Sequence, residues 1–373
     1  MEAAETHRAS WRLLPFEKVV WSGQRSNVPP DSFWVFLPVL LFAVALVSAL
    51  FASLLGVAEL PGMHRTFGLA ALLAACGIAA VLTPRYLFDG VAYLVTDRRI
   101  LWRRGRFIRS MERGKLSYAR IHWHRSVPVV GHLELVVAVP FGPLSRRMRI
   151  MLHDVREPDR LLALIRDVEA SEHAGDRDVS ILDRLEHGES VIWGGHPRGV
   201  HLGWRELSIT LLGVAVTAMG VLYGQRNAEI LLSLEGLGLQ VRSAEWALLF
   251  SAVAISWVCI LTIGLGLIWN GSVRAHRLGR ATEYLLTERR LLIRRGLVEL
   301  SVDRKQIVDV ATQPAGGGLQ HLFLMLDAPQ SRAISDSGAL SPLLPARAAV
   351  PPVLFEIREA DHVRNLILGT PAE

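Results

Sequence analysis

The sequence predicts an α+β membrane protein in which four transmembrane helices carry two copies of an antiparallel β domain, each closed by a C-terminal helix. Three observations lead to this fold class. The chain has 373 residues and is 51% hydrophobic, which is high for a soluble protein. It contains four long stretches without charged residues. It also repeats one arginine-rich segment about half its length apart.

The repeated segment reads YLVTDRRILWRRG at residues 93–105 and YLLTERRLLIRRG at residues 284–296. Nine of the thirteen positions are identical, so we interpret the two segments as products of a tandem duplication. An upstream pair, FEKVVWSG and GESVIWGG, shares a glutamate, a tryptophan and a glycine, and a downstream pair, VREPDRLLALI and IREADHVRNLI, ends each unit. The duplication leads us to expect that the two units pack as a pseudo-twofold pair.

The uncharged stretches are long enough to cross a bilayer, for which a helix needs roughly 20 apolar residues. They run from Ser32 to Ala58, Thr66 to Pro84, Leu207 to Gln225 and Trp246 to Val273. We predict two transmembrane hairpins rather than two buried hairpins of a soluble core. The charges of the outer loop at 226–245 favour an amphipathic helix on the membrane surface, and a re-entrant segment is the alternative.

The distribution of basic residues predicts the orientation. Residues 85–206 hold 21 basic and 16 acidic residues, whereas the outer loop at 226–245 holds two basic and three acidic residues. By the positive-inside rule, both arginine-rich regions and both termini are expected in the cytoplasm. Polar, charge-bearing residues precede the first span, so we expect no cleavable signal peptide.

These features divide the chain into six parts. They are a cytoplasmic lead-in at 1–31, a transmembrane hairpin at 32–84, a β domain at 85–170, a linker and second lead-in at 171–206, a second hairpin with its outer loop at 207–273, and a second β domain at 274–373.

Each β domain is expected to begin with the repeated segment as a β-hairpin, since Tyr, Leu, Val and Thr favour strands and TDRR or TERR supplies the turn. HLELVVAVPFG and RMRIMLHDV are predicted as further strands of the first domain, and LQHLFLMLD and PVLFEI of the second. Each domain closes with a short helix, for which Asp159 and Asp361 are the expected N-caps.

The Glu-x-x-x-Trp lead-in, the pair of spans, the Y-L-x-T-[DE]-R-R-x-L-x-x-R-G segment and the closing helix resemble the membrane-flanked type of the bacterial pleckstrin-homology (PH) domain family. The resemblance covers both units, and the hairpin segment is its specific part. It implies a PH-like fold in each unit, a strongly bent antiparallel barrel capped by a C-terminal helix, and a place in the bacterial inner membrane. It implies no enzymatic activity. The Pro/Gly/Ser-rich insertion that begins at Pro329 departs from the pattern.

Other candidate chemistry is weak. A possible metal cluster in the first domain comprises His122, His124, His132 and His153. We find no counterparts in the second domain and no accompanying cysteine, so we expect no metal and no cofactor. The carboxylates Asp97 and Glu288 precede arginine pairs and are expected to cap turns or to form ion pairs. No catalytic triad or phosphate loop is found, so we expect no enzyme.

The candidate site consists of the eight arginines of the repeated segments. Each hairpin follows a span by about ten residues, so these side chains are candidate contacts for anionic lipid headgroups. The alternative is that they solvate strand ends and enforce topology. The residues are Arg98, Arg99, Arg103, Arg104, Arg289, Arg290, Arg294 and Arg295.

The most favoured function is a non-enzymatic scaffold or assembly factor that presents two cytoplasmic PH-like domains to a protein partner, to anionic lipid, or to both. A transporter or an envelope-stress-resistance component is the alternative. Transport is disfavoured because the spans contain no ionisable groups, and small residues such as Gly213, Gly220, Gly264 and Gly266 explain the spans as packed anchors. Nucleic acid is not an expected partner.

Overall fold

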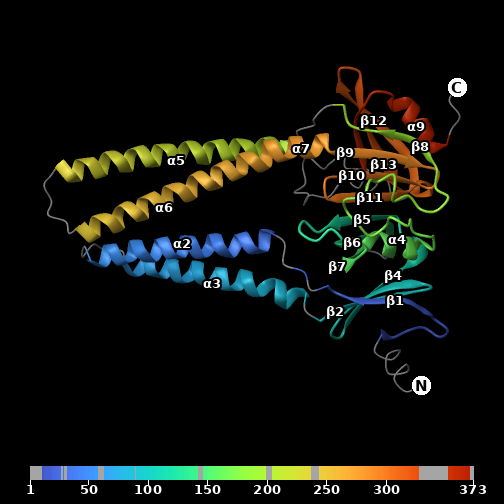
Figure 1. Ribbon diagram of the computed structural model, residues 1–373, viewed down its shortest axis with the longest axis horizontal. Helices are drawn as coiled ribbons and strands as arrows, with labels where there is room; N and C mark the ends of the chain where they lie inside the picture. The colour runs from blue at the N-terminus through green and yellow to red at the C-terminus, as the bar shows by residue number, and fades with distance from the viewer. Residues whose placement is uncertain are drawn as a thin grey trace. The chain divides into compact units, whose positions relative to one another are not determined.

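The computed structural model describes residues 11–26, 28, 32–57, 63–88, 90–141, 146–198, 204–236, 243–326 and 352–369. The chain divides into two compact units. The helical unit comprises residues 30–89 and 202–275, and the β unit comprises residues 1–29, 90–201 and 276–373. Both repeats therefore belong to one unit, in which Figure 1 shows all the strands.

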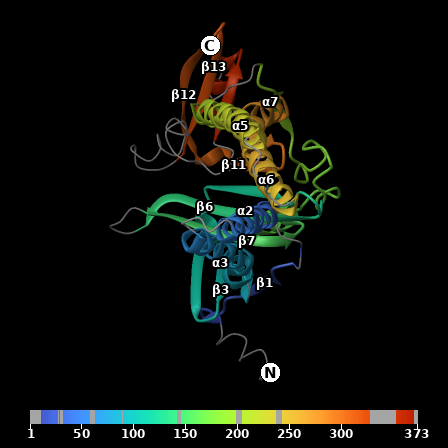
Figure 2. The same cartoon turned by 90° about the vertical axis from the view of Figure 1, so that its left-hand side faces the viewer.

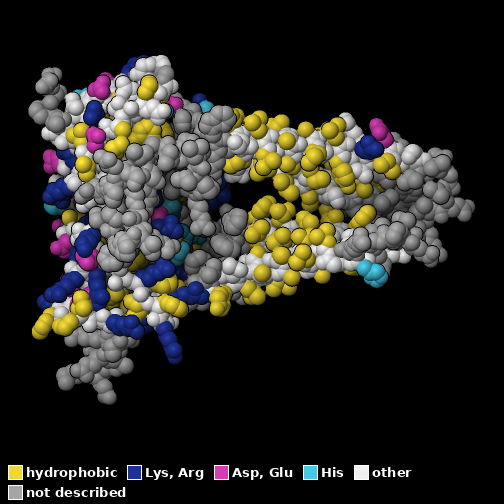
Figure 3. All heavy atoms as spheres, turned by 180° about the vertical axis from the view of Figure 1, so that it is seen from behind, with side chains coloured by type: hydrophobic (Ala, Val, Ile, Leu, Met, Phe, Trp, Pro, Cys, Tyr) yellow, Lys and Arg dark blue, Asp and Glu magenta, His cyan; other side chains and the backbone are white. Residues whose placement is uncertain are grey.

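Within its described residues, the helical unit contains four helices that are long and apolar enough to cross a membrane. They form two hairpins, α2 (Ser32–Val57) with α3 (Met63–Phe88) and α5 (Trp204–Gly236) with α6 (Ser243–Ile268), and α2 also lies against α6. In Figure 3, most of the coloured side chains on these helices are hydrophobic, whereas most charged side chains lie over the β unit. This distribution is compatible with helices that are solvated by lipid.

Helix α5 continues through residues 226–236, where we expected an outer loop. No proline or glycine occurs between Gln225 and Gly236, so nothing interrupts the backbone hydrogen bonds of the helix. A separate surface helix or a re-entrant segment does not describe these residues. The rest of the expected loop, at 237–242, lies outside the described residues.

Glycines allow α5 and α6 to approach closely. A Cβ atom at Gly264 would lie 2.3 Å from Oγ1 and 2.8 Å from the amide nitrogen of Thr217, and one at Gly213 would lie 2.7 Å from the amide nitrogen of Ile268. Gly266, which we grouped with these residues, has open space at its Cβ position. Close contact through small residues is the usual way in which helices associate in lipid.

A leucine at position 264 should therefore force α5 and α6 apart. We expect Gly264→Leu to destabilise the detergent-solubilised full-length protein by about 1–3 kcal/mol, as overpacking does in other well-packed interiors. Thermal unfolding measures this effect. Gly266→Leu adds the same side chain to open space and should change stability by less than about 0.5 kcal/mol. Equal destabilisation by the two variants would contradict the close approach.

Two short helical segments join α6 to the β unit. A π-helical turn, η2 (Trp269–Val273), follows α6 directly, and α7 (Arg274–Arg280) leads into the first strand of the second arginine hairpin.

Among the described residues, each repeat of the β unit contains four strands, a 3-10 turn, three further strands and a helix. The first repeat comprises β1 (Val19–Gln24), β2 (Val91–Thr96), β3 (Arg99–Arg104), β4 (Phe107–Glu112), η1 (Arg113–Lys115), β5 (Tyr118–Trp123), β6 (Val130–Phe141), β7 (Arg146–Arg156) and α4 (Pro158–Arg166). The second comprises β8 (Val191–Gly195), β9 (Thr282–Thr287), β10 (Arg290–Arg295), β11 (Val298–Asp303), η3 (Arg304–Gln306), β12 (Ile307–Gly316), β13 (Leu319–Leu326), β14 (Val353–Ile357) and α9 (Ala360–Leu368).

The sequence repeat is therefore a repeat of structure. The bounds of β2, β3 and β4 become those of β9, β10 and β11 when 191 is added to each residue number. The predicted arginine hairpins, the four further strands and the two closing helices are confirmed. The strand character of both lead-ins was not predicted: β1 pairs with β2, and β8 pairs with β9.

The strands form three antiparallel sheets. Strands β1–β4 form one and β12–β14 form another, and the third has seven strands in the order β7-β6-β5-β11-β10-β9-β8. The second half of the first repeat and the first half of the second repeat thus share one sheet. They are joined at β5 and β11, which pair from Tyr118 opposite Val302 to His122 opposite Val298.

The joined strands are not equivalent. Strand β11 corresponds to β4 of the first repeat rather than to β5. A twofold pair would bring equivalent surfaces together. The expectation of a pseudo-twofold pair is therefore wrong for this ladder, which joins the repeats head to tail.

Two hydrophobic cores lie on opposite faces of the seven-stranded sheet at this junction, because neighbouring side chains of a strand alternate between faces. Ala119, Ile121 and Trp123 of β5 belong to the first core, with the β1–β4 sheet and α4. Tyr118 and Val136 lie in the second core, with β12–β14 and α9. Figure 1 shows β5, β6 and β11 between the two smaller sheets, and Figure 2 shows β6 and β11 there as well.

Each repeat is an open two-sheet unit rather than a closed barrel. Its two sheets contribute to the same core, but no strand ladder joins them within the described residues. The helix of each repeat packs on its second sheet, α4 against β5 and β6, and α9 against β12 and β13.

The closing helices begin earlier than expected. Their N-caps are Glu157 and Glu359, neither of which makes a side-chain cap. Asp159 and Asp361 lie in the first turn instead, so the N-cap prediction for both aspartates is wrong. Pro158 can begin α4 because the first helical position needs no backbone N–H.

A proline at Ser301 should break the ladder between β5 and β11. Ser301 lies opposite Ala119 in the centre of the seven-stranded sheet, where a proline removes a ladder hydrogen bond. We expect Ser301→Pro to lower the free energy of unfolding by about 3 kcal/mol or more, measured by thermal and denaturant unfolding.

The matched control is Ser110→Pro. Ser110 occupies the equivalent position of β4, which is an edge strand among the described residues. Edge strands tolerate proline where the N–H faces outward. We therefore expect a much smaller effect, and equal losses in the two variants would contradict the central position of the β5–β11 ladder.

Candidate functional site

A buried ion pair joins the lead-in of the first repeat to its arginine hairpin. Arg99 donates from Nε to Oε1 of Glu17 at 2.8 Å and from Nη2 to Oε2 at 2.9 Å. The Thr96 hydroxyl donates to the same Oε1 at 2.7 Å. Burial by itself raises the pKa of Glu17, but hydrogen bonds from Arg99, the Leu14 N–H and Thr96 outweigh it and lower the pKa to about 2. Glu17 is therefore ionised at neutral pH.

The second repeat contains the same contact. Arg290 donates from Nε to Oε1 of Glu189 at 2.9 Å and from Nη2 to Oε2 at 2.8 Å, and the Thr287 hydroxyl donates to Oε1 at 2.6 Å. Burial by itself raises the pKa of Glu189, but the hydrogen bonds and the charge of Arg290 outweigh it and lower the pKa. The glutamate of the lead-in and the second arginine of T-[DE]-R-R thus form one repeated structural contact, which we name the Glu–Arg lock.

The same threonines cap the hairpin turns. Oγ1 of Thr96 accepts the N–H of Arg99 at 2.9 Å, and Oγ1 of Thr287 accepts the N–H of Arg290 at 3.0 Å. The acidic turn residues bond to the lead-ins instead. Asp97 accepts the N–H of Lys18 at 3.0 Å, and Glu288 accepts the Ser190 hydroxyl at 2.5 Å.

The tryptophan and glycine of each lead-in also fit together. Residues two apart on a strand project from the same face. A Cβ atom at Gly23 would lie 2.3 Å from the Trp21 ring, and one at Gly195 would lie 2.6 Å from the Trp193 ring. Each glycine therefore makes room for a ring that packs on the core of its repeat.

A further pair of equivalent arginines holds the closing helices. Nη2 of Arg113 donates to the Leu164 carbonyl at 2.5 Å, and its Nε donates to that of Ile165. Arg304 donates to the carbonyls of Leu366 at 2.6 Å and Ile367 at 2.9 Å. The last carbonyls of a helix carry partial negative charge, so these cations stabilise both helix ends.

The structure gives the eight candidate arginines different surroundings. Arg99 and Arg290 are engaged in the Glu–Arg locks, with side chains only 17% and 8% exposed. The guanidinium group of Arg103 lies 4.4 Å from the centroid of the Trp11 ring. Arg98 and Arg289 are exposed in the two turns. Contact with headgroups remains a prediction, and the locked pair is poorly placed for it.

The hairpin also separates its arginines along its length. Arg104 pairs with Val91, three residues after Phe88, the last residue of α3. Arg98 lies at the opposite end, six residues away and about 20 Å along the strand. Arg295 likewise pairs with Thr282 at the start of β9. The first residue of the strand that follows each helix hairpin is therefore paired with Arg104 or Arg295, and the turn arginines lie at the other end of that strand.

The linker between the repeats forms a buried ion pair with β11. Arg184 donates from Nη2 to Oε1 of Glu299 at 2.6 Å and from Nη1 to Oε2 at 3.1 Å. Its guanidinium group also lies 5.2 Å from the centroid of the Trp123 ring in β5. The linker therefore contacts both strands that join the repeats.

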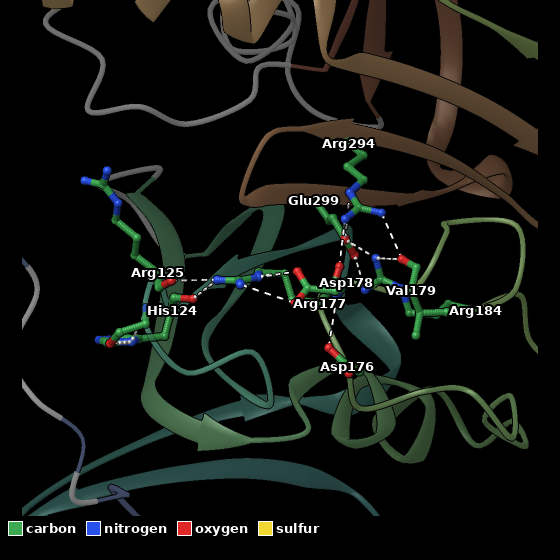
Figure 4. Close-up of polar contacts among 10 residues, drawn as sticks. His124, Arg125, Asp176, Arg177, Asp178, Val179, Arg184, Arg294 and Glu299 are labelled. Atoms are coloured by element: carbon green, nitrogen blue, oxygen red, sulfur yellow. Dashed lines mark hydrogen bonds and ion pairs between the residues drawn. The ribbon is translucent and has the colours of Figure 1, made fainter.

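A second set of contacts connects the linker to both repeats, as Figure 4 shows. Arg177 of the linker donates to the carbonyls of His124 and Arg125 in the first repeat, both at 2.8 Å. Arg294 of the second repeat donates to the carbonyls of Arg177 at 2.7 Å and Val179 at 3.0 Å. Arg294 is thus used to fix the linker.

The turns of the two arginine hairpins line one cavity of about 480 Å³. Arg98 enters it from the first repeat and Arg289 from the second, and these two residues are equivalent in the duplication. Arg166 at the end of α4 and Glu186 of the linker line it as well. Burial lowers the pKa of Arg166, whose Nη2 lies 2.9 Å from Oδ1 of Asp303. Residues of both repeats and of the linker therefore line this open cavity.

The histidines serve the fold. Nδ1 of His132 accepts the N–H of Asp154 at 3.0 Å, and Nδ1 of His321 accepts the N–H of Glu356 at 3.1 Å. Asp154 and Glu356 both have positive φ, 51° and 55°. The expectation that the first-repeat histidines have no counterparts is therefore wrong for His132. Over the described ranges, no group of three or more His, Cys, Asp or Glu residues could hold a metal ion.

Glu134 forms the centre of a polar cluster on the first repeat. Its carboxylate lies 3.4 Å from Nε2 of His122, 3.2 Å from Nη1 of Arg149 and 3.6 Å from Nη1 of Arg120. Burial by itself raises the pKa of Glu134, but the hydrogen bond from His122 and the two arginine charges outweigh it and lower the pKa to about 2. A group held ionised in this way has the character of a structural ion pair.

Comparisons of the chain with protein-family models, with curated proteins and with solved structures find no match.

Sequence reasoning identified both halves of the Glu–Arg lock without joining them. Glu17 and Arg99 each recur in the second repeat, and this shared recurrence was the available signal. The linker residues Arg184 and Glu186 were missed. They lie between the repeated segments, so the duplication carries no signal for them.

Removal of one partner of the lock should be strongly destabilising. We expect Glu17→Ala to cost about 3 kcal/mol or more, because Arg99 would keep a largely buried charge without its bidentate partner. Thermal and denaturant unfolding of the full-length protein measure this. The control is Glu112→Ala, whose carboxylate is 61% exposed and pairs with Lys115, a contact worth about 0–1 kcal/mol. Similar losses would contradict the lock.

Proposed function

We propose that this chain is a non-enzymatic, membrane-anchored scaffold or assembly factor. Its four apolar helices hold the β unit at the cytoplasmic face of a bacterial inner membrane, with both termini in the cytoplasm. The β unit presents two PH-like repeats as one binding platform for a protein partner. Anionic headgroups are a further partner for the arginines near the ends of β3 and β10.

The observation that carries the proposal is the fusion of the two repeats through β5 and β11. Each repeat contributes to the core of a shared structure, so the two present their surfaces in one fixed relation. The repeated polar residues are used to build this structure, as the two Glu–Arg locks show. A rigid pair of binding surfaces on one anchor raises the effective concentration for a second contact.

Support for the PH-like assignment comes from the order of elements. In the described part of each repeat, four strands are followed by three strands and a closing helix, and both sheets contribute to one core. Among the described strands, the sheets of both repeats have open edges. Open strand edges are surfaces to which an extended peptide segment can add.

Affinity purification from the native membrane tests the proposal. We expect the full-length protein, extracted in mild detergent, to retain a defined protein partner that mass spectrometry identifies. A chain that carries only the four spans should lose this partner, and Gly266→Leu, which leaves the β unit unchanged, should keep it.

The opposite outcome would overturn the scaffold role. Recovery of the same proteins with the spans alone would place the function in the helices. Solute flux through vesicles that contain only the purified protein would then favour a transporter.

A further inference from the structure

We propose that the cavity between the two hairpin turns binds an anion that carries a phosphate or diphosphate group, held between the guanidinium groups of Arg98 and Arg289. This site is separate from the protein-binding role proposed above. It assigns a ligand class to a place that is formed only when the two repeats are joined.

The charges around the cavity leave these two arginines available. Each acidic side chain of the lining is engaged by another group: Asp97 by the N–H of Lys18 (3.0 Å), Asp167 by Arg113 (3.3 Å), Glu186 by Arg290 (2.9 Å) and Asp303 by Arg166 (2.9 Å). Within the described part of the chain, no hydrogen bond or ion pair engages the guanidinium group of Arg98 or of Arg289. The guanidinium groups of Arg98 and Arg289 therefore line the cavity without a carboxylate partner among the described residues.

The donor set fits a phosphate group. A guanidinium group offers paired N–H donors in a planar fork, and a phosphate offers three oxygens with which two such forks can bond at once. Nε of Arg166 is also buried in the lining and makes no hydrogen bond to any described residue. The volume of about 480 Å³ lies in the range of small-ligand sites and exceeds what one phosphate needs.

Both arginines are held on rigid supports. Each directly precedes the arginine of a Glu–Arg lock and directly follows an acidic residue that bonds to the lead-in. The threonine of each turn caps the backbone beside it. The turn backbones are therefore fixed before a ligand arrives, which reduces the entropic cost of binding.

The phosphate can belong to a soluble compound or to a lipid headgroup. The turns lie at the ends of the hairpins opposite the residues that follow the helices, about 20 Å along the strand from Arg104. The chemistry of the two arginines is the same in either case.

The test uses the full-length protein in nanodiscs of neutral lipid, with inorganic pyrophosphate as the probe. We expect pyrophosphate to raise the unfolding temperature and to bind measurably by calorimetry, whereas sulfate at equal ionic strength gives a smaller effect. Arg98→Ala and Arg289→Ala should each weaken pyrophosphate binding at least about tenfold, the usual effect of losing a hydrogen bond to a charged group. Both side chains are exposed, so both variants should fold.

Arg106→Ala is the matched control. Arg106 is an exposed arginine between β3 and β4 that does not line the cavity, and its loss changes the net charge equally. No pyrophosphate binding by the wild type, or an equal loss in Arg106→Ala, would overturn the proposal. Nanodiscs that contain phosphatidic acid distinguish the sources. If they suppress pyrophosphate binding, the ligand is a headgroup, and if they do not, it is soluble.

Discussion

The β5–β11 ladder is the interaction on which the β unit depends. Without it, Tyr118 and Val136 would lose the core that they share with the second repeat, and that core would lose one of its walls. An antiparallel ladder satisfies the backbone groups of both strands, which would otherwise form two open edges. The alternation of side chains then places one core on each face of the same sheet. A single line of backbone hydrogen bonds thus couples the two copies into one body.

The buried ion pairs specify this arrangement more than they stabilise it. Taking a carboxylate and a guanidinium group out of water costs free energy that their attraction only partly returns. Each pair also requires one geometry, because a bidentate contact tolerates little displacement. The Arg184–Glu299 pair fixes the linker on β11, and the two locks fix the lead-ins on their hairpins. These contacts therefore select one register for segments that lie far apart in the sequence.

Duplication followed by divergence explains why the two repeats play different parts. Both keep the lock, the threonine cap, the tryptophan and glycine of the lead-in and the arginine on the closing helix. They differ at the edges, where β5 of the first repeat is paired and its counterpart β12 is an edge strand among the described strands. β12 has Pro314 where β5 has Trp123. The backbone N–H of Trp123 donates to the Leu297 carbonyl at 2.8 Å across the junction. A proline cannot make that bond, so this edge is less suited to a further copy.

The sequence by itself determined the duplication, the four apolar helices, the two arginine hairpins and the closing helices. These features are written in local periodicity and composition, because a helix needs a long apolar run and a hairpin needs strand formers around a turn. Only the tertiary structure decided that Glu17 meets Arg99, that β5 meets β11 and that Arg98 and Arg289 line the same cavity. Such pairings depend on which surfaces become complementary after the chain has folded. The paired residues lie 82 to 191 positions apart, and this separation leaves no periodic pattern in the sequence. For the same reason, the linker residues that fix the two repeats could be recognised only in three dimensions.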